Sequence, residues 1–143
     1  MEPSRNLVEF MKPKSMGKRD WGEEILIALS PGNYTLKKLF IKAGKKGGLQ
    51  YHHLKDESGY VVFGSLIIRH DNGKGELIET IVKEGEWFRF PPNSVHQEEA
   101  ITDCLIIEAS TPHYNDRVRV ENEYGLKEEK GLKSTKISEV NKL

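Results

Sequence analysis

Cysteine is nearly absent from the sequence: Cys104 is the only one in 143 residues, which excludes an internal disulfide. An excess of one charge is absent too, because 22 lysines and arginines balance 22 aspartates and glutamates. Such a chain sets up no long-range field that attracts a nucleic-acid backbone, so we expect no nucleic acid as a partner. No apolar run approaches the roughly 20 residues that span a bilayer, and the first residues lack the apolar core of a signal peptide. These absences predict a soluble, cytoplasmic protein without membrane attachment.

Short β-branched and aromatic runs dominate the middle of the sequence, separated by glycine, proline and asparagine. No run within residues 23–110 keeps a helical period over three turns, so the sequence predicts antiparallel strands in a sandwich or barrel. Residues 60–70 form a continuous apolar run, typical of a strand that is buried on both faces or crosses a barrel. Asn72 and Gly73 follow it as a hairpin turn signal. Cys104 begins another apolar run, where we expect it to fill the core.

The two ends of the chain differ from the middle in composition. Residues 1–18 are polar and predict an arm, either disordered or with a short edge strand around residues 7–10. Residues 127–143 are heavily charged and predict a solvated tail with at most one helical turn. A chain of 143 residues supports one core more readily than two. We therefore expect a single domain, residues 19–126, between the arm and the tail.

Two clusters that begin with glycine carry the candidate site. The first reads, in order, Gly44, Gln50, His52, Glu57 and Gly64. The second reads Gly85, Pro91, Asn93 and His96. Residues two apart on a strand share a face, so Gln50 and His52 converge while His53 points away.

These residue types indicate a metal site. Two imidazoles, a carboxylate and an amide oxygen suit one divalent transition metal, Zn²⁺, Fe²⁺, Mn²⁺, Co²⁺ or Ni²⁺, and ligand type does not choose among them. The positions left open for water or substrate indicate a catalytic site rather than a purely structural one. The plain alternative is a set of polar residues at turns. Gln50 could also be a hydrogen-bonding neighbour of the site instead of a ligand.

The spacings resemble the paired motifs of the cupin superfamily, the RmlC-like jelly rolls. Gln50 within "LQYHH", "RDWG" at Arg19–Gly22 and "NDRVRVENEYGL" at 115–126 are most similar to the C-terminal cupin domain of type II phosphomannose isomerases, the bifunctional mannose-1-phosphate guanylyltransferases. The resemblance implies an all-β double-stranded β-helix, the jelly-roll cupin barrel. It also implies a metal bound by Gln50, His52, Glu57 and His96.

The same resemblance implies an isomerase or epimerase that acts on a small molecule, a sugar or sugar phosphate. A proton would move between adjacent carbons through a side chain, and Glu57 and Glu98 are candidates for it, with Glu99 beside them. Lys46 is a further candidate at the site. It stands where the isomerases usually have arginine, so it keeps the charge but lacks the fork that suits a phosphate. The chain also has Leu54 where they usually have a third histidine.

Three further residues are candidates for substrate contact. Trp87 and Arg89 share a face of one predicted strand, which could line the cavity of a barrel, and Arg69 could contact an anion. Core packing for the tryptophan and solvated charge for the arginines are the plain alternatives.

Two other functions stay open, an iron-dependent dioxygenase and a non-catalytic sugar-binding module. Because cupins commonly pair through an edge strand, the resemblance also implies a homodimer, with the N-terminal arm crossing to the partner.

Overall fold

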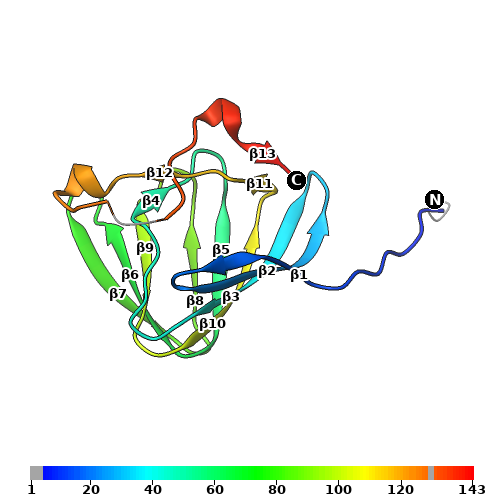
Figure 1. Ribbon diagram of the computed structural model, residues 1–143, viewed down its shortest axis with the longest axis horizontal. Helices are drawn as coiled ribbons and strands as arrows, with labels where there is room; N and C mark the ends of the chain where they lie inside the picture. The colour runs from blue at the N-terminus through cyan, green and yellow to red at the C-terminus, as the bar shows by residue number, and fades with distance from the viewer. Residues whose placement is uncertain (1–4, 129–130) are drawn as a thin grey trace.

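Two antiparallel β-sheets face each other in the body of the protein (Figure 1). The computed structural model describes residues 5–128 and 131–143. The six-stranded sheet has the order β1 (Lys14–Arg19), β2 (Gly22–Ser30), β3 (Tyr34–Ile41), β10 (Cys104–Ser110), β5 (Glu57–Phe63), β8 (Trp87–Phe90). The five-stranded sheet has the order β12 (Val118–Arg119), β4 (Gln50–Tyr51), β9 (His96–Ala100), β6 (Ser65–Asp71), β7 (Leu77–Lys83). The remaining elements are β11 (His113–Tyr114), which pairs with β13 (Asn141–Lys142), and the 3₁₀ helices η1 (Glu121–Tyr124) and η2 (Ile137–Glu139). This arrangement confirms the predicted all-β jelly-roll fold.

The chain crosses from one sheet to the other at Gly64, so the apolar run of residues 60–70 makes two strands. β5 ends in the six-stranded sheet, and β6 begins one residue later in the five-stranded sheet. Gly64 has a φ of 95°, a conformation that glycine tolerates and other residues rarely adopt. A Cβ here would lie 2.2 Å from the carbonyl oxygen of Asp103. The sequence predicted one continuous strand here, and the structure corrects this to two strands that meet at Gly64.

The inner face of the six-stranded sheet changes from apolar to charged along its strands. The inward partners on β3 and β10 are Ile41 and Cys104, Leu39 and Ile106, Lys37 and Glu108, Thr35 and Ser110, and all are buried. The apolar end packs into the core with Leu66 and Phe90, where a fully buried aliphatic side chain stabilises by about 1.5–3 kcal/mol. Cys104 is buried there, as predicted. The charged end faces a polar cavity instead.

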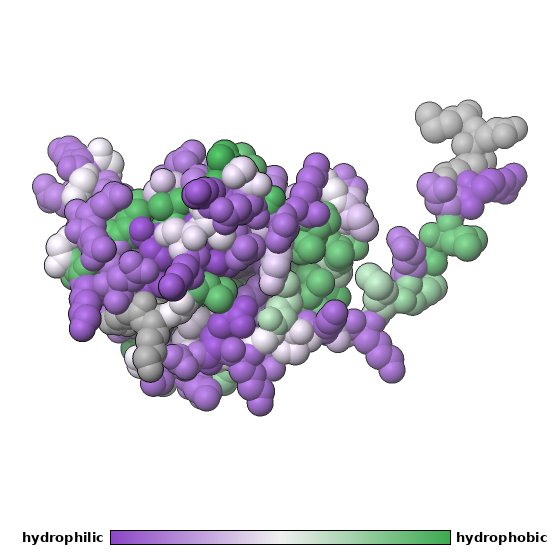
Figure 2. Space-filling view, turned by 45° about the horizontal axis from the view of Figure 1, so that its top comes forward, coloured by the Kyte–Doolittle hydropathy of each residue, from purple (hydrophilic) through white to green (hydrophobic). Residues whose placement is uncertain are grey.

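The N-terminal segment extends away from the body (Figure 2). Residues 5–13 form no strand, and Leu7 and Phe10 are each 89% exposed. The edge strand suggested around residues 7–10 is therefore not formed in this structure. Strand β1 begins instead at Lys14, inside the stretch assigned to the arm, and pairs with β2. An edge strand is held by backbone hydrogen bonds on one side only, so polar side chains suit it and give little sequence signal.

The C-terminal segment lies along the body, where the sequence predicted a solvated tail. Strand β13 pairs with β11, and the Leu143 N–H donates to the Pro112 carbonyl at 2.8 Å. The Gly32 N–H donates to the Leu143 carbonyl at 2.7 Å. These are backbone contacts, so a polar and charged sequence can make them while its side chains stay exposed. Within residues 5–128 and 131–143, no helix is long and apolar enough to cross a membrane.

Candidate metal centre

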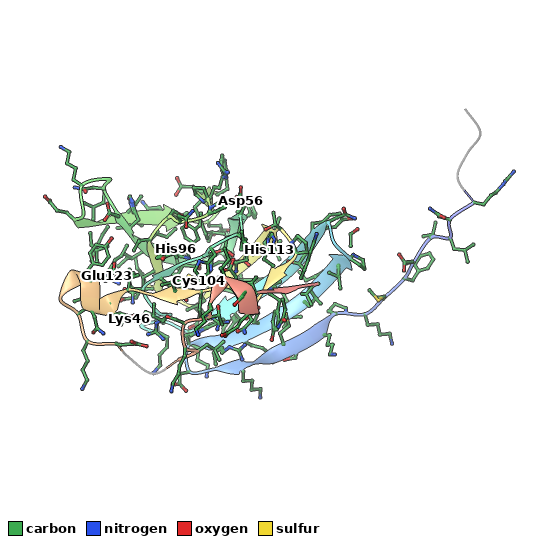
Figure 3. The ribbon with its side chains drawn as sticks, turned by 90° about the horizontal axis from the view of Figure 1, so that it is seen from above. Lys46, Asp56, His96, Cys104, His113 and Glu123 are labelled. Atoms are coloured by element: carbon green, nitrogen blue, oxygen red, sulfur yellow. The ribbon has the colours of Figure 1, made fainter. Side chains whose placement is uncertain are left out.

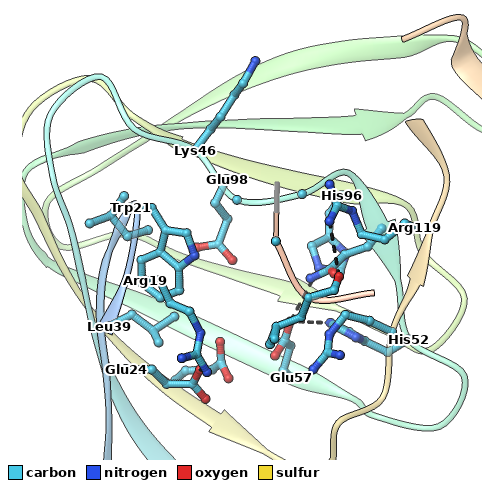
Figure 4. Close-up of a pocket in the computed structure, with 18 of the residues that line it drawn as sticks. Arg19, Trp21, Glu24, Leu39, Lys46, His52, Glu57, His96, Glu98 and Arg119 are labelled. Carbon is cyan, nitrogen blue, oxygen red and sulfur yellow. Dashed lines mark hydrogen bonds and ion pairs between the residues drawn. The ribbon is translucent and has the colours of Figure 1, made fainter. Parts of the chain in front are cut away.

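Three buried side chains from distant parts of the chain converge between the sheets (Figure 4). His52 follows β4, while Glu57 and His96 are the first residues of β5 and β9. Glu57 Oε1 lies 3.0 Å from His52 Nε2 and 3.7 Å from His96 Nε2. One nitrogen or oxygen of each residue lies within 4.8 Å of the others. Seen from above, His96 lies within the body of the protein, away from the N-terminal segment (Figure 3).

The backbone orients both imidazole rings. His52 Nδ1 donates to the Asp116 carbonyl at 2.5 Å, and His96 Nδ1 donates to the Ser94 carbonyl at 2.9 Å. Phe90 stacks on the His96 ring, with centroids 3.8 Å apart and planes at 13°. An imidazole that is neutral and donates from Nδ1 keeps the lone pair of its Nε2 free, and in both residues Nε2 is the atom that faces the Glu57 carboxylate. Three lone-pair donors that meet away from solvent fit a cation between them, and nitrogen with oxygen donors suits a divalent transition metal.

The protonation states agree with this donor set. Burial, followed by the charge of His52, lowers the pKa of His96 to about 3. Burial would raise the pKa of Glu57, but Lys55 and the two histidines outweigh it, so the pKa lies well below its usual value. Lys55 Nζ lies 2.9 Å from Glu57 Oε2. At neutral pH the site therefore offers an unprotonated imidazole at His96 and a carboxylate at Glu57.

Asp116 holds the turn that follows His52, and the sequence did not reveal this role. Its carboxylate accepts the backbone N–H groups of His53, Leu54 and Lys55 at 2.8, 2.8 and 2.9 Å. Burial would raise the pKa of Asp116, but these three N–H donors outweigh it and keep the pKa below its usual value. The same residue orients His52 through its carbonyl. Asp116 therefore fixes both the His52 ring and the turn that leads to Glu57.

A cavity of about 820 Å³ opens from the three side chains, and most of the residues that line it are polar or charged. Gln50 lines it, with its Cα paired to that of His96 across β4 and β9. Glu98 also lines it, and burial, followed by the charge of Glu57, raises the Glu98 pKa to about 8. Burial and Glu57 likewise raise the pKa of Glu108 well above its usual value. Lys46 stands at the rim and points away from the cavity (Figure 4).

The structure does not bring the three predicted substrate-contacting residues to this cavity. Within the described residues, Trp87, Arg89 and Arg69 are not among those that line it. Phe90 on β8 is buried, so by alternation Trp87 and Arg89 face outward, and Trp87 is 70% exposed. Arg89 pairs with Asp56 at 2.7 and 3.0 Å. Arg69 is engaged on the other sheet by Glu79, Gln97 and Glu99.

Known proteins show the same fold. The chain matches an RmlC-like cupin from Shewanella frigidimarina at a TM-score of 0.59 and 17% identity, over 78% of this chain and 95% of that one. It matches the capsular polysaccharide assembling protein CapF from Staphylococcus aureus at a TM-score of 0.61 and 25% identity, over 69% of this chain and 30% of CapF. The chain therefore has the RmlC-like cupin fold.

In sequence, the chain is 31% identical over 116 residues to the mannose-1-phosphate guanylyltransferase RfbM of Salmonella typhimurium. The match covers 78% of this chain and 23% of RfbM. The chain thus spans less than a quarter of the length of that relative. No protein-family model matches the chain.

Proposed function

We propose that this cupin is a metal-dependent isomerase or epimerase that acts on a sugar or sugar phosphate. The observation that carries the proposal is the His52, Glu57 and His96 cluster, buried at one side of a polar cavity of about 820 Å³. A cavity of this volume is within the range of small-molecule sites. The sequence similarity to RfbM, a mannose-1-phosphate guanylyltransferase, supports a sugar-linked substrate.

His52, Glu57 and His96 would hold the metal, with the amide oxygen of Gln50 as a fourth ligand. A bound divalent cation would supply Lewis acidity toward a carbonyl oxygen. Glu98 is our candidate for the group that moves the proton, because it lines the cavity and its Oε2 is buried with no hydrogen-bond partner among the described residues. The Lys55 ammonium holds the Glu57 carboxylate in place from the side of Oε2.

The test loads the purified protein with Zn²⁺, Fe²⁺, Mn²⁺, Co²⁺ or Ni²⁺ and measures aldose–ketose conversion and epimerisation across a panel of sugars and sugar phosphates. We expect turnover with at least one metal, and Glu57→Gln should lose both tight metal binding and turnover. Glu79→Gln is the matched control, because Glu79 pairs with Arg69 outside the cavity. Oxygen uptake by the iron-loaded protein would indicate a dioxygenase instead. Ligand protection against unfolding without any turnover would indicate a binding module.

A further inference from the structure

Arg19 reaches the cavity from the end of β1, on the side away from His52 and His96 (Figure 4). Its guanidinium lies over a bulge in β1 at Gly17, where an added Cβ would lie 2.5 Å from Arg19 Nη1. The polar contacts that it makes are long: Nη1 donates to the Lys18 carbonyl at 3.4 Å, and Nη2 lies 3.7 Å from Glu24 Oε2. The missing side chain at Gly17 makes room for this guanidinium, whose donors are only weakly used.

Arg117 lines the same cavity just before β12. Its Nη1 donates to Asn115 Oδ1 at 2.8 Å and to the Lys133 carbonyl at 3.1 Å. Within residues 5–128 and 131–143, its Nε and Nη2 donors make no hydrogen bond. Burial lowers the pKa of the Arg117 guanidinium; Glu24 opposes this shift and the positive charge of Arg19 adds to it. The fold thus places two guanidinium groups on the wall of one cavity.

The acidic side chains near these two arginines have closer partners or are screened by solvent. Glu24 Oε1 lies 2.9 Å from the buried ammonium of Lys37, a closer partner than Arg19. The Asp116 carboxylate accepts three backbone N–H groups. Asp20 also lines the mouth, but it is exposed, so solvent and salt screen its charge. Positive charge therefore exceeds the available negative charge on this side of the cavity.

We propose that Arg19 and Arg117 form an anion-binding site, called here the seat, that binds the phosphate or carboxylate group of the substrate. The planar fork of a guanidinium matches the paired oxygens of either group. This inference rests on the proposed function in one respect, that the anion belongs to a sugar whose reacting carbons lie toward the metal centre. The seat takes the place of Arg69 and Arg89, which lie outside the cavity. It makes the preferred substrate a phosphorylated or acidic sugar rather than a neutral one.

The test is calorimetric titration of the full chain with inorganic phosphate, a hexose 6-phosphate, a hexuronate and the neutral hexose. Removing one charge-assisted contact in Arg19→Met or Arg117→Met should weaken binding of the favoured anion about ten- to a hundredfold. Arg117→Lys, which keeps the charge and loses the fork, should fall between. Arg5→Met is the matched control, an exposed arginine in the N-terminal segment, and should bind like the unchanged chain. Tighter binding of the hexose phosphate than of the hexuronate, or the reverse, identifies the anion.

Failure of the seat and failure of the proposed function give different results. If no anion binds, or if folded Arg19→Met and Arg117→Met bind it as tightly as the unchanged chain, the seat is wrong whatever the turnover. If these variants raise KM equally for neutral and anionic sugars, the proposed enzyme activity is supported and the seat is refuted. Anion binding that persists in Glu57→Gln and depends on both arginines, without turnover of any sugar, would keep the seat and refute the isomerase.

Discussion

Replacing Asp116 with asparagine exchanges one carboxylate oxygen for an amide nitrogen and tests whether this residue holds the turn after His52. In the structure Oδ1 accepts one backbone N–H, and Oδ2 accepts two. Asparagine has a single acceptor atom, so its best orientation keeps two bonds and turns the NH₂ group against the N–H of His53. The change loses a charge-assisted bond and leaves a donor poorly satisfied. We expect the free energy of unfolding to fall by about 2–4 kcal/mol.

Two measurements follow the consequences of Asp116→Asn. Urea unfolding gives the stability change, with an unchanged m-value expected because the folded surface is the same. Metal titration gives the effect on the centre: groups that orient metal ligands typically change affinity about 10–100-fold, and we expect a loss in that range. The pH dependence has a definite sign. Because the folded pKa of Asp116 lies below the ordinary 3.8, its stabilisation is complete above that value and is lost as the pH falls below it. The variant should lack this part of the acid sensitivity.

Asp103→Asn is the control for this prediction. The Asp103 carboxylate accepts one N–H, from Ala43 at 2.8 Å, at an exposed position. Its replacement should change the free energy of unfolding by less than about 1 kcal/mol. Equal stability and equal metal affinity of the two variants would refute the role that we assign to Asp116.

Three further predictions concern other parts of the molecule. The raised pKa of Glu108 means that above pH 4.5, its ordinary pKa, the folded chain holds a proton that the unfolded chain releases, so the protein loses stability as the pH rises. Glu108→Gln should remove this loss. Melting temperatures from pH 5 to 9 measure it, and an unchanged dependence of melting temperature on pH would contradict the prediction. Gly64→Ala should cost more than about 3 kcal/mol or prevent folding, because its Cβ would meet the Asp103 carbonyl; expression and circular dichroism test this, and a stable variant would show that the crossing can relax. A homodimer stays predicted, and the exposed apolar side chains of Leu7 and Phe10 support it; a monomer by light scattering would refute it.

The sequence predicted the fold class and the residues of the candidate metal centre that the fold brings together, because both depend on local spacing. Glycine-framed runs separated by turn residues indicate strands, and alternation on a strand chooses His52 over His53. His96 lies 44 positions after His52, yet β4 and β9 are neighbours in one sheet, so the two motifs meet. Sequence periodicity alone could not say which face of β8 turns inward. The inward position of Phe90 decides this, and it places Trp87 and Arg89 outside.

The contributions of Asp116 and of the C-terminal segment could not be predicted, because both act through the backbone. A carboxylate that accepts three N–H groups of a distant turn has no signature in residue type. Likewise, β13 and Leu143 bind the body through main-chain groups. Such contacts leave no signal in the sequence, so the charged composition of this segment led to the prediction of a solvated tail. The anion seat was missed for a related reason: Arg19 depends on the space above Gly17, and Arg117 on the loop before β12.

The backbone role of this turn also explains why Leu54 is compatible with a metal centre. The resemblance to the isomerases implies a third histidine at this position, and its loss raises the question whether a ligand is missing. The Leu54 side chain is 42% exposed, and the contact that the position makes to the site region is its N–H bond to Asp116. A histidine with the same backbone would point toward solvent, away from Glu57. Because the turn keeps its shape through main-chain donors, the side chain here can vary while His52, Lys55 and Glu57 stay in place.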